Sequence, residues 1–303
     1  MSENGAQSYR VEHHTTYRYS EPVMLSHQQL HLTPRPLDYQ QCSVHDIVIR
    51  PNPTSRREFI DAFGNPVGEL AIETAHSALD IVARTAVEVT RRPPVEFHKT
   101  PAWETVREAL AYRAAWHPGP AILDATQYLF ESPYARVKRS LGAYAADCFA
   151  PGRPILAAAT ALMEKIHGDF KFDAAATNVT TPVIKFFEQK RGVCQDFTHL
   201  MISCLRSTGL AARYVSGYLL TRTAPGKPRR AGADVSHAWV SLYVPGSGWI
   251  DLDPTNNVVP SSEHITLGWG RDFSDVTPLR GVINGGGEQT LEVKVTVEPI
   301  IRA

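Results

Sequence analysis

A cysteine lies where the sequence changes from a polar loop to an apolar, helix-like segment. In "RGVCQDFTHLMISCLRSTGL", Cys194 follows Arg-Gly-Val and opens a segment that closes at Gly209. A thiol at a helix N-terminus lies near unpaired backbone N–H groups and the positive end of the helix dipole. Both favour the thiolate, the nucleophilic form of cysteine, so we interpret Cys194 as a candidate nucleophile. Cys204 lies among apolar residues of the same segment and is assigned to the core.

A nucleophilic thiol needs a base, and the nearest histidine in the sequence is badly placed. At about 100° per residue, His199 lies about 140° around the helix from Cys194, so a packing or hydrogen-bonding role is expected. In "HAWVSLYV" the period of a strand places His237 and Trp239 on one face. Ala238 and the alternate apolar residues face the core. His237 is therefore the candidate base.

A carboxylate that could orient His237 follows on the next predicted strand. In "WIDLDPT", Asp251 and Asp253 share one face. If a five-residue loop around "PGSG" joins the two strands, Asp253 lies opposite Trp239 and diagonal to His237, within side-chain reach. A four-residue loop without a bulge would put the two on opposite faces. A helix-start thiol, an imidazole and a carboxylate form the logic of a nucleophile, base and orienting group.

The surrounding patterns predict an α+β protein. Short alternating runs with Pro, Asn and Gly between them indicate an N-terminal antiparallel β-sandwich domain over residues 1–95, ending in the linker "RRPPVEFHKTP". Residues 96–303 are assigned to a helical segment and a core with a C-terminal strand, "TLEVKVTVEPI". Apolar periodicity predicts helices within 100–114, 154–170, 180–190 and 194–209. The segment "GRDFSDVTPLRGVINGGG" is expected to be a loop.

Composition excludes several classes of protein. The chain has 303 residues, 43% hydrophobic, with 31 basic and 31 acidic side chains. Without a basic excess, no nucleic-acid partner is expected, and the "KPRR" run near residue 227 is interpreted as a solvated loop. The N-terminus does not resemble a secretory signal, and no apolar run is long enough to span a membrane. The four cysteines have no paired spacing, so a cytoplasmic protein without disulfides or zinc is expected.

Four motifs in series resemble the transglutaminase-like superfamily: "GVCQDFTHL", "RYVSGY", "SHAWV" and "GWIDLDPT". The N-terminal "YRVEHHTTYRYSEPVMLSHQQLHLTPRP" resembles the β-rich domain of bacterial members, and "GRDFSDVTPLRGV" resembles their C-terminal segment. The resemblance implies a papain-like core in which Cys194 is the nucleophile, His237 the general base and acid, and Asp253 the orienting group. Asp251 is the competing carboxylate, but the family's aspartate directly precedes a Pro-Thr pair, as Asp253 does.

The resemblance also implies the reaction, which is acyl transfer on a peptide or protein substrate through a thioester, without a cofactor. Bacterial relatives look more like hydrolases, so a peptidase or amidase is expected, and a crosslinking enzyme with an amine acceptor is the alternative. The sequence has no acidic cluster of the kind that binds calcium, so calcium dependence is not expected. Gln195 is a candidate second donor to the oxyanion. Trp239 is expected to pack against the helix that starts at Cys194 and to shield the site. Tyr218 is expected either to line a cleft or to be a partly buried packing residue.

Two other interpretations stay open from the sequence. A non-catalytic protein could keep this fold and use its cleft to bind peptides. A metal site could form from Cys194, His199 and His237, although these residues lack the short paired spacing of ligands. The oligomeric state is not predicted.

Overall fold

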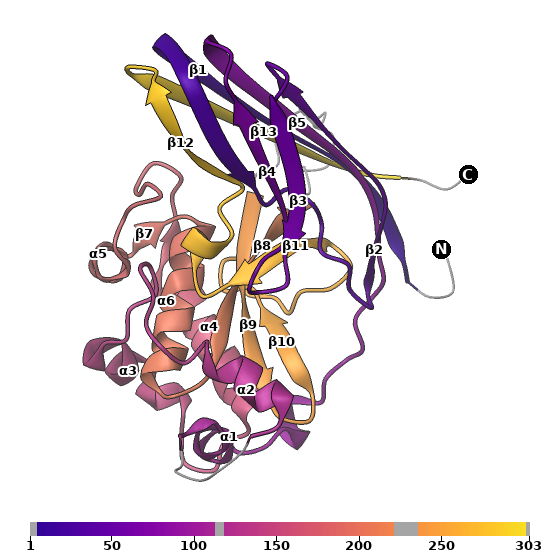
Figure 1. Ribbon diagram of the computed structural model, residues 1–303. Coiled ribbons are helices and arrows are strands. Elements are labelled where there is room, and N and C mark those ends of the chain that lie inside the picture. The colour runs from indigo at the N-terminus through magenta and orange to yellow at the C-terminus, as the bar shows by residue number, and fades with distance from the viewer. Residues whose placement is uncertain (1–4, 113–117, 221–235, 301–303) are drawn as a thin grey trace, which may run out of the picture.

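The computed structural model describes residues 5–112, 118–220 and 236–300. A β-rich part lies above a part in which helices pack on a four-stranded sheet (Figure 1). The fold is therefore α+β, as the sequence patterns predict. The "KPRR" run at residues 227–230 and the last residues of the first expected helix lie outside the described residues.

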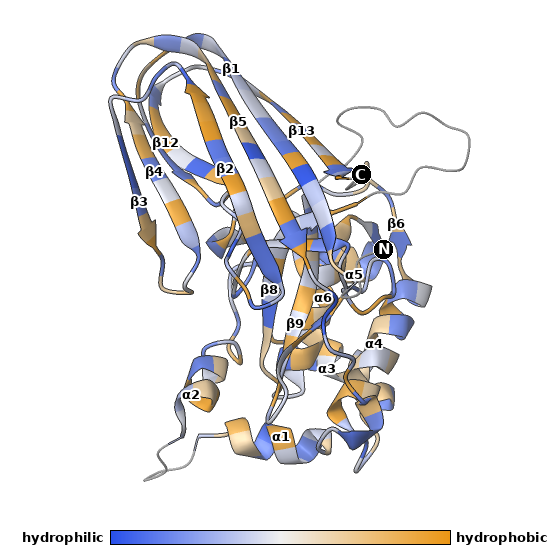
Figure 2. Ribbon diagram, turned by 90° about the vertical axis from the view of Figure 1, so that its right-hand side faces the viewer, coloured by the Kyte–Doolittle hydropathy of each residue, from blue (hydrophilic) through white to orange (hydrophobic). Residues whose placement is uncertain are grey.

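The β-rich part is antiparallel and is organised around one long strand. Its strands are β1 (Gln7–Leu30), β2 (Gln40–Arg50), β3 (Ser55–Ile60), β4 (Pro66–Ile72), β5 (His76–Val89), β12 (Leu279–Gly285) and β13 (Gln289–Pro299). The first part of β1 pairs with β5 and β13, whereas its last part pairs with β4 and β12. Polar and apolar residues alternate along these strands (Figure 2). The apolar ones enclose a core that includes Leu30, Ile49, Leu70 and Ile81.

The two C-terminal strands differ from the sequence-based division. The sequence patterns assign residues 96–303 to one unit. In the structure, however, β12 and β13 both pair with β1 and so belong to the N-terminal sheet. The expected loop over 270–287 is also wrong, because it contains β12. In β12 only Leu279 is buried, so the strand has no alternating pattern that a sequence could show. Its regular structure depends on backbone pairing with β1, which is distant in the chain.

Six α-helices are described in the lower part. They are α1 (Trp103–Leu110), α2 (Pro120–Thr126), α3 (Arg139–Ala145), α4 (Ile155–Asp169), α5 (Val183–Gln189) and α6 (Cys194–Ser207), with single 3₁₀ turns at η1 (Phe97–Lys99), η2 (Ala146–Cys148) and η3 (Phe273–Asp275). The helices α1, α4, α5 and α6 fall within the expected ranges. The short α2 and α3 were not expected. Each of these two helices has only seven residues, about two turns, which is too short to show a clear helical periodicity of apolar residues.

The lower sheet has the order β10-β9-β8-β11, formed by β8 (Ala212–Leu219), β9 (Ser236–Val244), β10 (Gly248–Leu252) and β11 (His264–Gly270). A separate parallel pair joins β6 (Lys171–Phe172) to β7 (Arg191–Gly192). The helix α6 packs against β9 and β8, and its residues from Gln195 to Arg206 are all buried. It is thus a central helix whose N-terminal end is held by the surrounding core.

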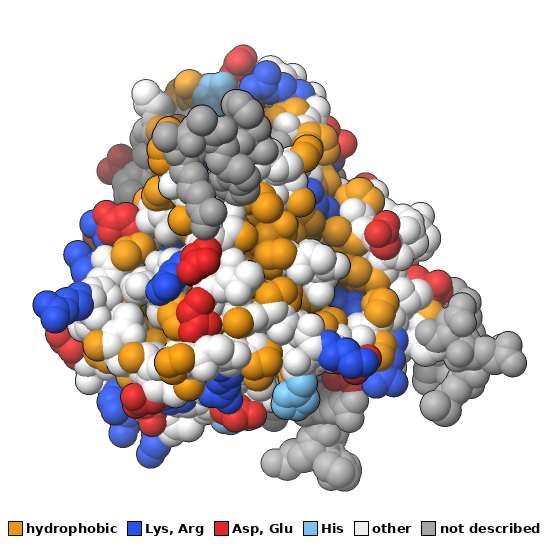
Figure 3. Space-filling view, turned by 90° about the horizontal axis from the view of Figure 1, so that it is seen from below, with side chains coloured by type: hydrophobic (Ala, Val, Ile, Leu, Met, Phe, Trp, Pro, Cys, Tyr) orange, Lys and Arg blue, Asp and Glu red, His pale blue; other side chains and the backbone are white. Residues whose placement is uncertain are grey.

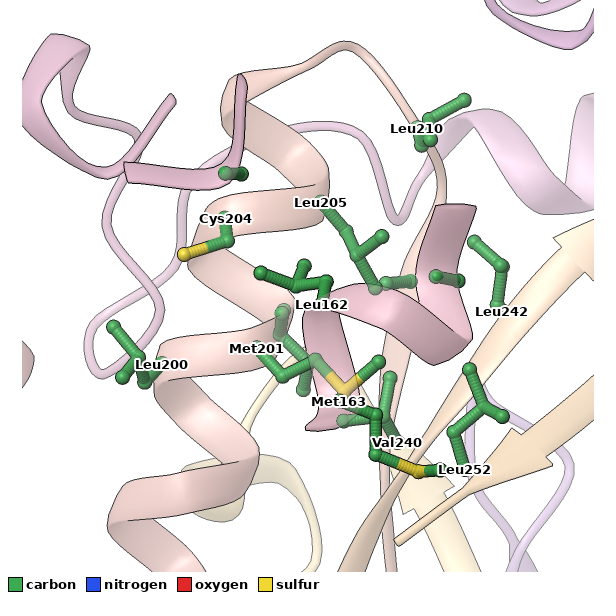
Figure 4. Close-up of a cluster of buried hydrophobic side chains, with 14 of the residues drawn as sticks. Leu162, Met163, Leu200, Met201, Cys204, Leu205, Leu210, Val240, Leu242 and Leu252 are labelled. Atoms are coloured by element: carbon green, nitrogen blue, oxygen red, sulfur yellow. The ribbon is translucent and has the colours of Figure 1, made fainter. Parts of the chain in front are cut away.

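Apolar side chains from α4, α6, β9 and β10 meet in one cluster (Figure 4). Leu205 lies in this cluster with no exposed surface. We expect Leu205→Ala to reduce the free energy of unfolding by about 2–5 kcal/mol, through lost transfer energy and the cavity that remains. Chemical denaturation monitored by circular dichroism measures this change. A loss below about 1 kcal/mol would mean that the core around α6 is not packed as described.

The outer surface agrees with the balanced composition. On the underside of the molecule, described acidic and basic side chains are interspersed with apolar ones rather than gathered by sign (Figure 3). Among the described residues, none of the helices combines the length and the apolar character that crossing a bilayer requires.

Candidate active site

The start of α6 is shaped by a close approach between Gly192 and the helix. The preceding helix, α5, ends at Gln189, and the next residue, Lys190, has a left-handed φ of 56°. A Cβ on Gly192 would collide with the Asp196 carboxylate and the Phe186 ring. That carboxylate accepts a hydrogen bond from the Val193 backbone N–H at 2.8 Å. Asp196 therefore caps the helix from its first turn, and glycine is the residue that leaves it room.

Cys194 is the first residue of α6, half-buried, with its Sγ 3.9 Å from the carbonyl oxygen of Ser236. At this position its backbone N–H has no acceptor within the helix. Ser236 begins β9 and directly precedes His237, so the helix start and the strand start lie together. The Cys194 side chain also lies close enough to the His237 ring to contribute to the raised pKa of that ring. Sulfur and imidazole, 43 positions apart in the chain, are thereby brought close together.

The strands β9 and β10 pair in the first of the two registers considered from the sequence, the one that places Asp253 opposite Trp239. Leu252 pairs with Val240, so Asp253 lies opposite Trp239 and diagonal to His237. Asp253 also forms an isolated bridge with Val258, which ends the strand at a tight turn. The alternative four-residue register is wrong.

The Asp253 carboxylate is fully buried and surrounded by donors. His237 Nε2 lies 2.7 Å from Asp253 Oδ2. The other oxygen, Oδ1, accepts the backbone N–H groups of Thr255 and Asn256 at 3.0 and 3.2 Å. Burial by itself would raise the pKa of Asp253, but hydrogen bonds led by those from His237 and His264 hold it well below its usual range. Asp253 is therefore an ionised acceptor at neutral pH.

The same contacts act on the imidazole in the opposite direction. Burial by itself would lower the pKa of His237, but hydrogen bonds to Asp253 and Cys194 raise it to about 10. The site therefore favours an imidazolium flanked by a carboxylate and a sulfur. Such a group can carry a proton at neutral pH and deliver it to a departing atom.

The competing carboxylate, Asp251, has different partners. Its Oδ2 accepts the Trp239 indole N–H at 2.8 Å and pairs with Arg92 Nη1 at 2.6 Å. Burial would raise the pKa of Asp251, but Arg92 and the hydrogen bonds lower it. Although Asp251 and Asp253 lie on the same side of β10, only the second is bonded to His237 among the described contacts.

Two further residues contact Asp253 that the sequence patterns do not identify. His264 on β11 places Nε2 3.1 Å from Oδ2, and Asn256 places Nδ2 2.7 Å from the same oxygen. Asn256 stands three residues after Asp253 in a turn-forming stretch, which is a local signal for such a contact. His264 has no local signal, because β11 is separated from β9 by β8.

The other predicted residues lie around this centre in different ways. The Gln195 amide donates to the Val179 carbonyl at 3.0 Å, so its side chain is already engaged. Trp239 is fully buried and its ring lies 6.1 Å from the His237 ring. Its neighbours along β9, Ala238 and Val240, belong to the apolar cluster that includes α6, whereas the Trp239 indole N–H donates to Asp251. Tyr218 packs between the two parts of the molecule, where its hydroxyl lies 2.8 Å from His13 Nδ1.

His199 has the packing role that its position on the helix predicts. Its Nε2 accepts the Phe273 backbone N–H at 3.2 Å, and its ring stacks on Tyr134. Burial lowers the pKa of His199 to about 3, so the ring is neutral. Among the described residues, His199 belongs to no group of side chains close enough to share a metal ion. The metal site considered from Cys194, His199 and His237 is therefore not formed.

The raised pKa of His237 predicts a pH-dependent stability. A folded-state pKa of about 10, above the ordinary 6.5, means that protonation favours folding. This stabilisation is complete below about pH 6.5 and is lost as the pH rises through about 10. We expect the difference in unfolding free energy between the wild type and His237→Gln to shrink from pH 6 to pH 10. Urea denaturation across this range measures it, and a difference that grows with pH would contradict the ion pair.

Comparison with known proteins identifies the two parts separately. Residues 9–88 match the bacterial transglutaminase-like N-terminal region, and residues 142–254 match the transglutaminase-like superfamily. Protein Rv2569c of Mycobacterium tuberculosis is 38% identical over 304 residues, covering 98% of this chain and 94% of the relative. A protein-glutamine gamma-glutamyltransferase of Pseudomonas aeruginosa is 35% identical over 75 residues, 24% of this chain and 11% of the relative.

Among solved structures, a Cytophaga hutchinsonii protein named "Putative Cysteine Protease" superposes with a TM-score of 0.74 at 19% identity, covering 98% of this chain and 92% of the other. At this identity the likeness concerns the fold, and it extends over both parts of the molecule. The similarity to Rv2569c extends over nearly the whole chain, and the two matched regions are those of the transglutaminase-like family. Both findings indicate the same family as the four motifs around Cys194, His237 and Asp253. The chain belongs to the transglutaminase-like superfamily.

Proposed function

We propose that this protein is a cysteine-dependent acyl-transfer enzyme that hydrolyses peptide or amide bonds. The observation that carries this proposal is the position of His237, which is bonded through Nε2 to a buried carboxylate and directly follows Ser236, whose carbonyl oxygen lies 3.9 Å from the Cys194 sulfur. This is the arrangement that nucleophilic catalysis by a thiol requires: a nucleophile, a proton carrier and a group that orients the carrier.

The proposed reaction has two steps. The Cys194 thiolate attacks the carbonyl carbon, and the carbon–nitrogen bond then breaks as His237 gives its proton to the departing amine. This leaves a thioester on Cys194 and a neutral imidazole. In the second step His237 takes a proton from water, the resulting hydroxide attacks the thioester carbon, and the acid product leaves. The Cys194 thiolate and the protonated imidazole are restored.

The start of α6 is suited to the charge that develops in this reaction. The carbonyl oxygen becomes an oxyanion in each step, and the backbone N–H of Cys194 is available to donate to it. The positive end of the helix dipole acts on the same atoms. Gln195 remains a candidate for a second donor through its backbone N–H, since its side chain donates to Val179. Asp253 keeps the imidazole in the tautomer that presents Nδ1 to the sulfur.

Hydrolysis is the first candidate because the sequence motifs resemble bacterial members of the superfamily, which look more like hydrolases. The protein named as a cysteine protease resembles this chain over 98% of its length. The gamma-glutamyltransferase matches only 24% of it. Because both activities use the same nucleophile and proton carrier, the choice depends on whether water or an amine reaches the thioester. An amine acceptor is therefore the second candidate.

Two measurements on the full chain test the proposal. Electrophilic peptide probes should label Cys194 rapidly near neutral pH. Cys42, at the surface, and Cys204, in the core, should react slowly. The pKa of each of these two thiols is raised, by partial desolvation at Cys42 and by complete burial at Cys204. Equal, slow labelling of all three would favour a peptide-binding protein without catalysis. Substrates found with these probes are then incubated in ¹⁸O-water with and without a labelled amine. Incorporation of ¹⁸O into the product acid supports hydrolysis, and amine incorporation at its expense supports crosslinking.

A further inference from the structure

His264 contacts the Asp253 carboxylate of the candidate site, yet the proposed reaction does not use it. It is buried at the start of β11, and its Nε2 reaches Oδ2 of Asp253, which follows β10, although β9 and β8 lie between these two strands in the sheet. Gly217 on β8 leaves room for the Trp239 indole, because a Cβ there would collide with this indole and with the Ile265 carbonyl. The Trp239 ring meets the His264 ring edge-on at 5.2 Å. The contact is therefore built into the packing of three strands.

The protonation state of His264 follows from its neighbours. Burial lowers the pKa of His264 despite the nearby carboxylate, so the ring is neutral. An ionised carboxylate can only accept hydrogen bonds, so the proton of His264 must be on Nε2 and point at Asp253. Nδ1 is then an unprotonated acceptor, and it is buried without a hydrogen-bond partner among the described residues. Buried polar atoms without partners are rare in native proteins. The histidine is thus kept at a cost to stability.

The Oδ2 atom of Asp253 is shared by three donors. His237 lies at 2.7 Å, Asn256 at 2.7 Å and His264 at 3.1 Å. Each donated hydrogen bond draws negative charge from the oxygen that the imidazolium of His237 also uses. The charged and titratable groups that act on this centre come from α6, the linker, β9, the end of β10 and β11: Cys194, Arg92, His237, Asp253 and His264.

We propose that His264 is a positioning residue that tempers the basicity of His237 by donating to their shared carboxylate. Without this donor, Asp253 would hold the imidazolium more strongly and the histidine would release its proton less readily. Release to the departing amine is a step of the proposed reaction, so this inference rests on the proposed function. With the donor, His237 is orientated by Asp253 without being locked in its charged form.

Nuclear magnetic resonance titration of the His237 ring tests this directly, without a substrate. The titration is made in a Cys194→Ala background, with the resonance assigned by its loss in His237→Gln. His264→Phe removes the donor and keeps a ring in the cavity, and we expect the His237 titration to move to higher pH by about 0.5–1 unit. His264→Gln retains an N–H donor and should restore the original midpoint at least in part. His199→Phe, a buried histidine without contact to Asp253, is the matched control.

An unchanged midpoint in folded His264→Phe, or a shift to lower pH, would overturn the inference. Should His264→Phe not fold, His264→Leu removes the same donor with a smaller side chain. Asn256→Ala removes another donor to the same oxygen at an exposed position and should shift the midpoint in the same direction. The proposed function has a separate readout, because slow labelling of Cys194 in the wild type would refute it whatever His264 does. Normal labelling with no shift in the His264 variants would refute only this inference.

Discussion

Cys194→Ala is expected to reduce turnover by at least about 10³-fold while the protein stays folded. The substitution removes the sulfur that forms the thioester in the proposed reaction, whereas the backbone donors at the start of α6 remain. A half-buried thiol contributes little to packing, so the melting temperature should change by a few degrees at most. The measurements are kcat/KM on a substrate found with the peptide probes and thermal unfolding by circular dichroism.

Cys204→Ala is the matched control for this substitution. Cys204 lies on the same helix but is fully buried in the core, so its loss should reduce stability and leave the rate per folded molecule unchanged. If Cys194→Ala kept more than a few per cent of wild-type activity, the thioester mechanism would be excluded. If it failed to fold, Cys194→Ser would provide the same test with a side chain of similar size.

Asp253→Asn is expected to lower kcat/KM by about 10²–10⁴-fold. The amide cannot accept from His237 as the carboxylate does, and its N–H₂ group would favour the wrong tautomer of the ring. The imidazolium would also lose the negative charge that stabilises it. Steady-state kinetics across pH 5–10 measures both effects, since the loss of rate should be accompanied by a fall in the pKa of His237.

Asp251→Asn is the control for Asp253→Asn, because it removes a buried carboxylate that is not bonded to His237 in the described contacts. Asp251 lies two residues earlier, is also buried and pairs with Arg92. Its replacement leaves a buried guanidinium without its counter-charge, which should cost about 3–5 kcal/mol of stability. We expect a small effect on the rate of the folded protein. The reverse pattern, a large loss of rate with Asp251→Asn and none with Asp253→Asn, would transfer the orienting role to Asp251.

Local patterns were sufficient to predict the elements around Cys194. The start of α6 at Cys194 follows from the change of periodicity after Gly192. The alternation in β9 and β10 predicted which side chains share a face. The choice between two registers was left open by the sequence, because it depends on the geometry of the connecting turn. The structure decides it by pairing Leu252 with Val240.

Other features could not be predicted because they depend on contacts between distant segments. The C-terminal strand β13 alternates clearly, yet its partner is β1 at the other end of the chain. Strand patterns report which face is buried and do not name the neighbouring strand. The division of the chain into an N-terminal and a C-terminal unit was therefore too simple for residues 279–299.

The sequence by itself determined the helices α1, α4, α5 and α6, the faces of β9 and β10 that their side chains share, and the residue types at Cys194, His237 and Asp253. These depend on the chemistry of each side chain and on local periodicity, both of which can be read along the chain. Only the tertiary structure decided that His237 bonds Asp253 rather than Asp251 and that His264 shares the same oxygen. A hydrogen bond is sensitive to differences of less than 1 Å, and such distances arise from the packing of strands that the sequence does not place side by side.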